Sequence, residues 1–217
     1  MKVKVAIISI SSLLLIGLYF FAANAFKGSE EVRLGSLAEV NQKLFIPDHA
    51  PRLGDKNAPV KLVEFLDPEC ETCRVFYPYV KQILLKFEGK VELVVRYAPF
   101  HRNSINAVKV LEATRIQNKY WESLELLFAN QPYWADHHDP RPERIWELLP
   151  QVSVDVEQAK KDMNRPEIEE IIRKDMADLK ELGVRRTPSF FVNGKPLLEF
   201  GLEPLVALIE QELEASK

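Results

Sequence analysis

The stretch DPECETCR, residues 67–74, contains both cysteines of this 217-residue chain. Cys70 and Cys73 are separated by only two residues, so their thiols lie close enough to form a disulfide. Three kinds of site use such a pair: a structural zinc centre, a soft-metal carrier and a redox dithiol. The residues around the pair indicate which of these three kinds of site is present.

The residues on either side of the pair predict a strand followed by a helix. Val60 to Leu66 is a short apolar run, typical of a buried strand. From about Cys70 to Phe87, apolar side chains recur at helical spacing. A cysteine at the start of a helix is favoured as a thiolate, because free amides and the positive end of the helix dipole face it. A strand, the cysteine pair and a helix in this order favour redox chemistry.

The remaining sequence completes one α/β domain over residues 48–217. The further elements expected are a strand at Val91–Tyr97, helices over residues 103–183, a hairpin of Ser189–Val192 and Pro196–Phe200 around Asn193-Gly194, and a final helix that opens at Glu203-Pro204. Asn-Gly between two apolar runs is a strong hairpin signal. The helical block at about 103–183 therefore interrupts the domain as an insertion.

The N-terminus predicts export of this domain. Lys2 and Lys4 precede an apolar run from Val5 to about Ala23, which is long enough to span a bilayer because a spanning helix needs about 20 residues. The placement of charge puts the N-terminus inside and the domain outside. A cleaved signal peptide ending near Ala25 is the alternative. We expect residues 1–25 to be a signal anchor or signal peptide and residues 26–47 a tether. The domain would then be periplasmic or extracytoplasmic, anchored to the inner membrane by residues 5–23.

The overall composition is that of a globular protein, with 47% hydrophobic and 28% charged residues and a formal net charge of −3. A nucleic-acid partner would require a basic face, so none is expected. Exported proteins use disulfides to clamp distant segments, but Cys70 and Cys73 would close a very short loop with little gain in chain entropy. A purely stabilising disulfide is therefore the weaker interpretation.

Two features outside the pair fit redox chemistry. Glu64 lies in the apolar strand six residues before Cys70, where burial would raise the pKa of its carboxyl group and allow it to accept the proton of Cys73. The alternative is that Glu64 points outward from the strand. Thr187-Pro188 lies before the hairpin; a cis-proline there would expose the main chain of Thr187 for pairing with a bound peptide, although a trans bond is the commoner state.

Together these features resemble the thioredoxin superfamily. The resemblance rests on Cys70-x-x-Cys73, the acid six residues before it, Pro78 in the following helix and Thr187-Pro188 before the hairpin. The sequence CETC, combined with a helical block before GVRRTPSFFVNG at residues 183–194, resembles the exported DsbA-type thiol:disulfide oxidoreductases over roughly residues 48–215.

The resemblance implies a thioredoxin-like α/β fold with Cys70 as an exposed nucleophile and Cys73 as a buried resolving thiol. Pro188 would be a cis-proline that faces them, and Thr187 and Pro188 would bind substrate. The substrates would be proteins with thiols or disulfides, a membrane redox partner would complete the cycle, and neither a metal nor a dissociable cofactor would be needed.

The residues between the cysteines depart from the family pattern. Oxidising members commonly have proline-histidine there, whereas this chain has Glu71-Thr72. Glu69 and Glu71 add negative charge beside Cys70 and oppose its ionisation. We therefore expect a Cys70 pKa of roughly 6 to 7.5, above the value of about 3.5 reached by strong oxidants, and a leaning toward reductase or isomerase work.

Two functions of other classes remain open. The two thiolates could carry Cu(I), although no Met or His lies nearby to complete a site. The helical block could instead serve an anchored peptide-binding or chaperone module in which the dithiol is vestigial. His137-His138 could suggest a metal cluster, but the composition around it is that of a solvated loop.

Overall fold

The centre of the computed structural model is a mixed sheet. The structure describes residues 15–26, 28–29, 32–34, 36, 42–136 and 138–217. Within these residues the sheet has the strand order β1-β3-β2-β4-β5. Strands β2 (Val60–Leu66) and β3 (Val91–Tyr97) are parallel neighbours with the bounds expected from the sequence. Strand β4 (Ser189–Val192) runs antiparallel to β2 on its other side.

The two edges of the sheet differ from the expectation. Strand β1 (Arg52–Gly54) pairs with β3 in a segment for which no strand was expected. Strand β5 is only Lys195–Pro196, so it begins one residue earlier and is shorter than the strand expected at residues 196–200, although the N–H of Leu197 still donates to the carbonyl of Phe190 at 2.9 Å. The expected hairpin turn is confirmed: Asn193 and Gly194 have φ angles of 49° and 84°, which a tight hairpin turn requires.

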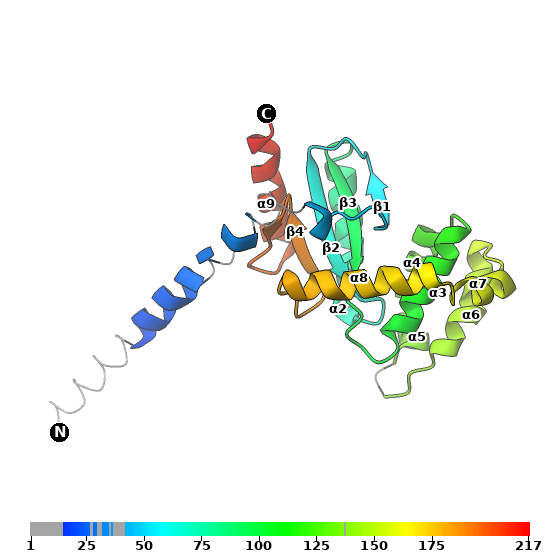
Figure 1. Ribbon diagram of the computed structural model, residues 1–217. Helices are drawn as coiled ribbons and strands as arrows, with labels where there is room; N and C mark the ends of the chain where they lie inside the picture. Colours follow the sequence, from blue (N-terminus) through cyan, green and yellow to red (C-terminus); the bar gives the residue numbers. More distant parts are fainter. Residues whose placement is uncertain (1–14, 27, 30–31, 35, 37–41, 137) are drawn as a thin grey trace, which may run out of the picture.

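Both faces of the sheet are covered, which explains why every residue of β3 is buried. Side chains alternate between the faces, so Leu62 and Leu66 pack in one apolar cluster with α2 (Glu71–Lys86) and α9 (Leu202–Ala215). Val63 and Phe65 pack in a second cluster with α8 (Pro166–Glu181). Figure 1 shows α8 crossing this second face of the sheet.

The expected helical insertion is present. It contains α3 (Ser104–Ile116), α4 (Tyr120–Ala129), α5 (Gln131–Trp134), α6 (Ile145–Leu148) and α7 (Val156–Asp162). These helices gather beside the sheet, opposite the N-terminal segment, and α8 leads the chain back across the sheet (Figure 1). Helix α8 is followed, after its C-cap Leu182, by Gly183 with φ 71°, and the N–H of Val184 donates to the carbonyl of Leu179 at 2.8 Å, which ends the helix where the sequence predicted.

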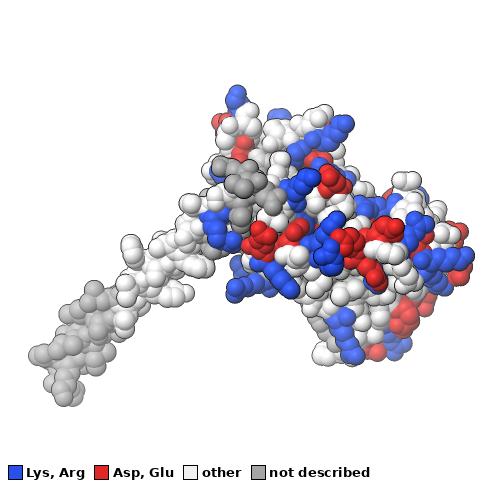
Figure 2. Space-filling view, viewed as in Figure 1, with Lys and Arg blue, Asp and Glu red and all other residues white. Residues whose placement is uncertain are grey.

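The N-terminal part of the described chain is a helical segment, residues 15–26, that contains no charged residue and appears uncharged in Figure 2. In the part of the chain that the structure describes, no helix has the length and apolar character needed to cross a bilayer. Residues 5–14 of the expected anchor lie outside the described residues. The end of the expected tether is packed: Phe45 is buried, and its ring centroid lies 5.4 Å from that of Phe191.

Candidate active site

Cys70 lies at the junction between β2 and α2, where it is the N-cap of the helix. Its Sγ accepts a hydrogen bond from the amide N–H of Cys73 at 3.5 Å, and both residues are free thiols. The side chain of Cys70 is less exposed than expected for an open nucleophile, because Cys70 is 6% exposed and Cys73 0%. The small accessible part of the pair therefore belongs to Cys70.

The loop before β4 meets Cys70, although it lies more than a hundred residues away in sequence. The Thr187–Pro188 bond is cis, which confirms the expected conformation. The thiol of Cys70 donates to the carbonyl oxygen of Thr187 at 3.4 Å, and Pro188 is buried beside it. The structure thus brings together the cysteine pair and the loop that the sequence singled out.

The surroundings of Cys70 lower the pKa of its thiol to about 5. The largest cause is a hydrogen bond from the side chain of Cys73, and burial acts in the opposite direction. The side chain of Thr187 and the amide groups of Cys73 and Thr72 also hydrogen-bond to the sulfur and lower its pKa. The range of 6 to 7.5 expected from the sequence is therefore wrong.

The pKa that we expected for Cys70 was too high, partly because Glu69 does not act on the thiol as its place in the sequence suggests. The Glu69 carboxylate is buried, and it accepts hydrogen bonds from the N–H of Asn103 at 2.7 Å, the side chain of Asn103 at 3.0 Å and the hydroxyl of Ser104 at 3.1 Å. Its charge is thus stabilised at the start of α3, where the helix dipole also favours an anion. Because Glu69 is next to Cys70 in the sequence, we overestimated the effect of its charge on the pKa of the thiol.

Cys73 and Glu64 form the buried side of the site. Burial is the main reason why the pKa of Cys73 is raised well above its ordinary value. Glu64 is fully buried, so it does not point outward, and no described residue hydrogen-bonds to either of its carboxylate oxygens. Burial, followed by the negative charge of Cys70, raises the pKa of Glu64 to about 8. The negative charge of Glu64 in turn raises the pKa of Cys73, so the carboxyl group interacts electrostatically with both thiols.

Asp67 and His101 fix the loop before Cys70, a role that the sequence analysis did not assign. The buried Asp67 carboxylate accepts hydrogen bonds from the N–H groups of Phe100 and His101 at 2.8 and 3.1 Å, and it bonds to the His101 ring at 2.8 Å. Burial opposes protonation of His101, but Asp67 and the charge of Cys70 raise its pKa overall. An aspartate directly after a buried strand was the available signal.

Gln131 connects the helical insertion to the redox motif. Its side-chain nitrogen donates to the carbonyl oxygens of Pro68 and Cys70 at 2.9 and 3.0 Å, and its oxygen accepts from Nε of Arg74 at 3.1 Å. Gln131 is 2% exposed, so water does not replace these bonds. Nothing in the sequence distinguishes this glutamine from others in the helical block.

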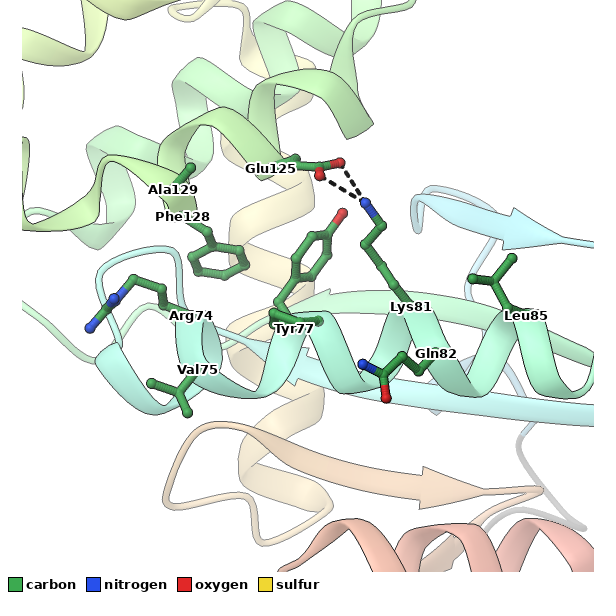
Figure 3. Close-up of a pocket in the computed structure, with 10 residues that line it drawn as sticks. Arg74, Val75, Tyr77, Lys81, Gln82, Leu85, Glu125, Phe128 and Ala129 are labelled. Carbon is green, nitrogen blue, oxygen red and sulfur yellow. Dashed lines mark hydrogen bonds and ion pairs between the residues drawn. The ribbon is translucent and has the colours of Figure 1, made fainter.

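The insertion also contacts α2 through α4, and residues of these two helices line a cavity of about 570 Å³. Figure 3 shows side chains of α2 and α4 facing each other across it. The rings of Tyr77 and Phe128 have centroids 5.3 Å apart, and Lys81 pairs with Glu125 at 2.8 Å. Neither cysteine lines this cavity, so it marks packing of the insertion on α2 rather than the redox centre.

Among the described residues there is no group of three or more His, Cys, Asp or Glu side chains that could hold a metal ion. The solvated loop expected around His137-His138 includes His137, which lies outside the described residues.

Most of the chain is similar to known proteins. Residues 48–211 match a family model described as thioredoxin. The chain is 33% identical over 175 residues to a probable disulfide bond formation protein D of Bacillus anthracis, a match that covers 75% of this chain and 77% of that protein. It also matches Na(+)/H(+) antiporters, such as one from Herminiimonas arsenicoxydans at 28% identity, but it spans only 22% of that antiporter's length.

Solved structures have the same fold. A thioredoxin-like oxidoreductase from Silicibacter pomeroyi has a TM-score of 0.69 and 28% identity, with 81% of this chain and 98% of that chain covered. The thiol-disulfide exchange protein alpha-DsbA2 from Wolbachia pipientis has a TM-score of 0.74 with 84% and 97% covered; at 21% identity this match supports the fold alone.

Proposed function

The chain belongs to the thioredoxin family as a DsbA-like thiol:disulfide oxidoreductase, and from this premise we propose that it oxidises thiols of exported proteins through Cys70 and Cys73. The observation that carries the proposal is the environment of Cys70. Its sulfur, at the N-cap of α2, accepts from the Cys73 amide and lies 3.4 Å from the carbonyl oxygen of Thr187. The N-cap position and the Cys73 amide stabilise a thiolate at Cys70, while the contact with Thr187 holds the cis-proline loop against the sulfur and Cys73 stays buried.

The direction of the reaction follows from the stability of that thiolate. A stable thiolate favours the reduced form, so the corresponding disulfide is a better oxidant. The pKa of about 5 for Cys70 lies between about 3.5 for the strongly oxidising DsbA and about 7 for thioredoxin. We therefore propose a donor of disulfides of intermediate strength, in place of the reductase or isomerase that we expected from the acidic neighbours.

Oxidation of a substrate proceeds in two exchange steps. A substrate thiolate attacks Sγ of Cys70 in the Cys70–Cys73 disulfide, a mixed disulfide forms, and Cys73 leaves as a thiolate that takes up a proton. A second substrate thiolate then attacks the substrate sulfur of the mixed disulfide, and Cys70 leaves as a stable thiolate. Two electrons pass from the substrate dithiol to the enzyme.

Glu64 is proposed to exchange the proton of Cys73. Its pKa of about 8 leaves its carboxyl group mostly protonated at neutral pH, yet close enough to the ambient pH to release the proton. It can therefore protonate Cys73 when this residue leaves, and it can remove that proton when the reduced enzyme is reoxidised. Its unpartnered oxygens are consistent with a role in transfer.

Thr187 and Pro188 are proposed to bind the substrate. The carbonyl of Thr187 is already next to Sγ of Cys70, so a peptide that pairs with the Thr187 main chain would present its cysteine to that sulfur. Export, anchoring by residues 5–23 and reoxidation by a membrane redox partner complete the proposal. Export and anchoring are supported by Lys2 and Lys4 before the apolar run. The redox partner is proposed because the reduced pair must be oxidised again after each exchange.

The proposal is tested by the redox state of the pair. Trapping thiols in growing cells should find Cys70 and Cys73 mostly oxidised, and equilibration with glutathione should give a potential between about −270 mV, the thioredoxin value, and about −120 mV, the DsbA value. A mostly reduced pair with a potential near or below that of thioredoxin would assign the enzyme to reduction instead.

A further inference from the structure

The loop that carries Thr187 also places two positive charges beside Cys70. Arg185 and Arg186 are exposed and directly precede Thr187, whose carbonyl oxygen lies 3.4 Å from Sγ of Cys70. Arg186 is one residue and Arg185 two residues before Thr187. Because consecutive Cα atoms are about 3.8 Å apart, both arginine side chains start within about 8 Å of the Cα atom of Thr187. A substrate segment that reaches the thiol along this loop must pass them.

A third arginine flanks Cys70 from the loop after β3. Arg102 is exposed and lies between His101 and Asn103. These two neighbours are anchored close to the redox motif, since the His101 ring bonds to Asp67 at 2.8 Å and the N–H of Asn103 donates to Glu69 at 2.7 Å. Cationic side chains therefore start from two separate segments around the thiol.

The three arginines are not neutralised within the described part of the protein, where their side chains make no hydrogen bond or ion pair. The nearby acidic side chains, in contrast, already have partners within the protein. Asp67 and Glu69 are buried and hydrogen-bonded, and the exposed Glu71 also has an interaction within the protein. The carboxylates around Cys70 are thus engaged while the guanidinium groups remain available.

We infer that the site prefers substrate segments with acidic residues close to the reacting cysteine. This inference rests on the proposed function, because it names the substrate class of the same site. Guanidinium groups bind carboxylates through paired N–H···O bonds, and an extended segment advances about 3.3 Å per residue. Acidic residues one to three positions from the cysteine would therefore meet Arg102, Arg185 or Arg186.

The test uses three dithiol peptides that are identical except for Asp, Asn or Lys beside one cysteine. Their oxidation by the full-length oxidised protein is measured at low and high salt, relative to uncharged dithiothreitol. We expect the Asp peptide to react about five-fold faster than the Lys peptide at low salt, in line with a few exposed ion pairs, and high salt should remove the difference.

Arg185→Gln/Arg186→Gln should reduce the preference, and Arg102→Gln should reduce it further. The matched control is Arg173→Gln, because Arg173 is exposed on α8 and pairs with Glu170, away from the dithiol; it should leave the preference unchanged. Equal rates for all three peptides at low salt, or a preference that survives the three substitutions, would overturn the inference alone. Failure of the wild type to oxidise any of the peptides or dithiothreitol would instead contradict the proposed function.

Discussion

The side-chain nitrogen of Gln131 donates a hydrogen bond to the main-chain carbonyl of Cys70 at 3.0 Å. The same carbonyl accepts the N–H of Arg74 at 3.1 Å in the first turn of α2, so the glutamine supports the turn on which the thiolate depends. The helical insertion therefore does more than cover one side of α2. It fixes the main chain of the redox motif, and we treat Gln131 as a positioning residue.

Gln131→Met should lower the free energy of unfolding by about 1–3 kcal/mol, because the buried carbonyl of Pro68 loses its partner. It should also raise the pKa of Cys70, because a looser first turn weakens the hydrogen bond from the Cys73 amide to the sulfur. Denaturant unfolding and the ultraviolet absorbance of the thiolate against pH measure the two effects.

Gln117→Met is the matched control for this change. Gln117 also joins two segments, with hydrogen bonds to the N–H and carbonyl of Asp155, but it lies away from the dithiol. It should lower stability without moving the pKa of Cys70. If Gln131→Met shifts stability alone, as the control does, Gln131 has only a structural role.

Thr187→Val should raise the pKa of Cys70 from its value of about 5, because the Thr187 side chain contributes a hydrogen bond that lowers it. Thr72→Val is the matched control, since Thr72 acts on the sulfur through its backbone N–H, which valine retains. Thiolate absorbance against pH measures both variants. Equal titration midpoints for Thr187→Val and the wild type would show that the hydroxyl does not stabilise the thiolate.

The central elements could be predicted because their own residues determine them. Val60–Leu66 and Val91–Tyr97 are mostly apolar, as expected for strands covered on both faces, and the helix after Cys70 has a clear apolar period. Strand β1 could not be predicted in this way. All three of its residues are exposed, so it carries no apolar pattern and is defined by its pairing with β3.

The candidate site could be predicted in part for a similar reason. The cysteines, Glu64 and Thr187-Pro188 belong to local patterns, but Gln131 meets Cys70 only through the packing of a helix 61 residues away. The pKa of Cys70 was mispredicted because charges were judged by sequence distance. In the folded protein, Glu69 bonds to the start of α3, and hydrogen bonds from Cys73 have the larger effect on the thiol.

Cys73→Ser should accumulate mixed disulfides between Cys70 and its substrates during reduction of a substrate disulfide. The thiolate of Cys70 can still attack, but no second thiol remains to release the substrate. Non-reducing electrophoresis followed by identification of the adducts measures this. The matched control is Cys70→Ser, which keeps only the fully buried thiol and should form far fewer adducts. Comparable adduct formation by the two variants would reverse the assigned order of attack.

Glu64 should make the stability of the protein depend on pH. Burial raises the pKa of its carboxyl group from 4.5 to about 8, so the folded protein retains a proton that the unfolded chain releases. The contribution of this group to stability is complete below about pH 4.5 and is lost as the pH rises toward 8. Since one pKa unit corresponds to about 1.4 kcal/mol, the loss amounts to a few kcal/mol at most.

Glu64→Gln should therefore remove this decline, because the amide is uncharged at every pH, and the variant should be more stable than the wild type at pH 8 and above. It should also slow the exchange step that involves Cys73 by roughly 10²-fold, since general acid–base catalysis contributes about this much. Denaturant unfolding across this pH range and stopped-flow exchange with a model disulfide measure the two effects. Glu125→Gln, on the exposed surface of α4, is the control that should keep the decline. A Glu64→Gln variant with the same decline as the wild type would show that Glu64 is already ionised in the folded protein.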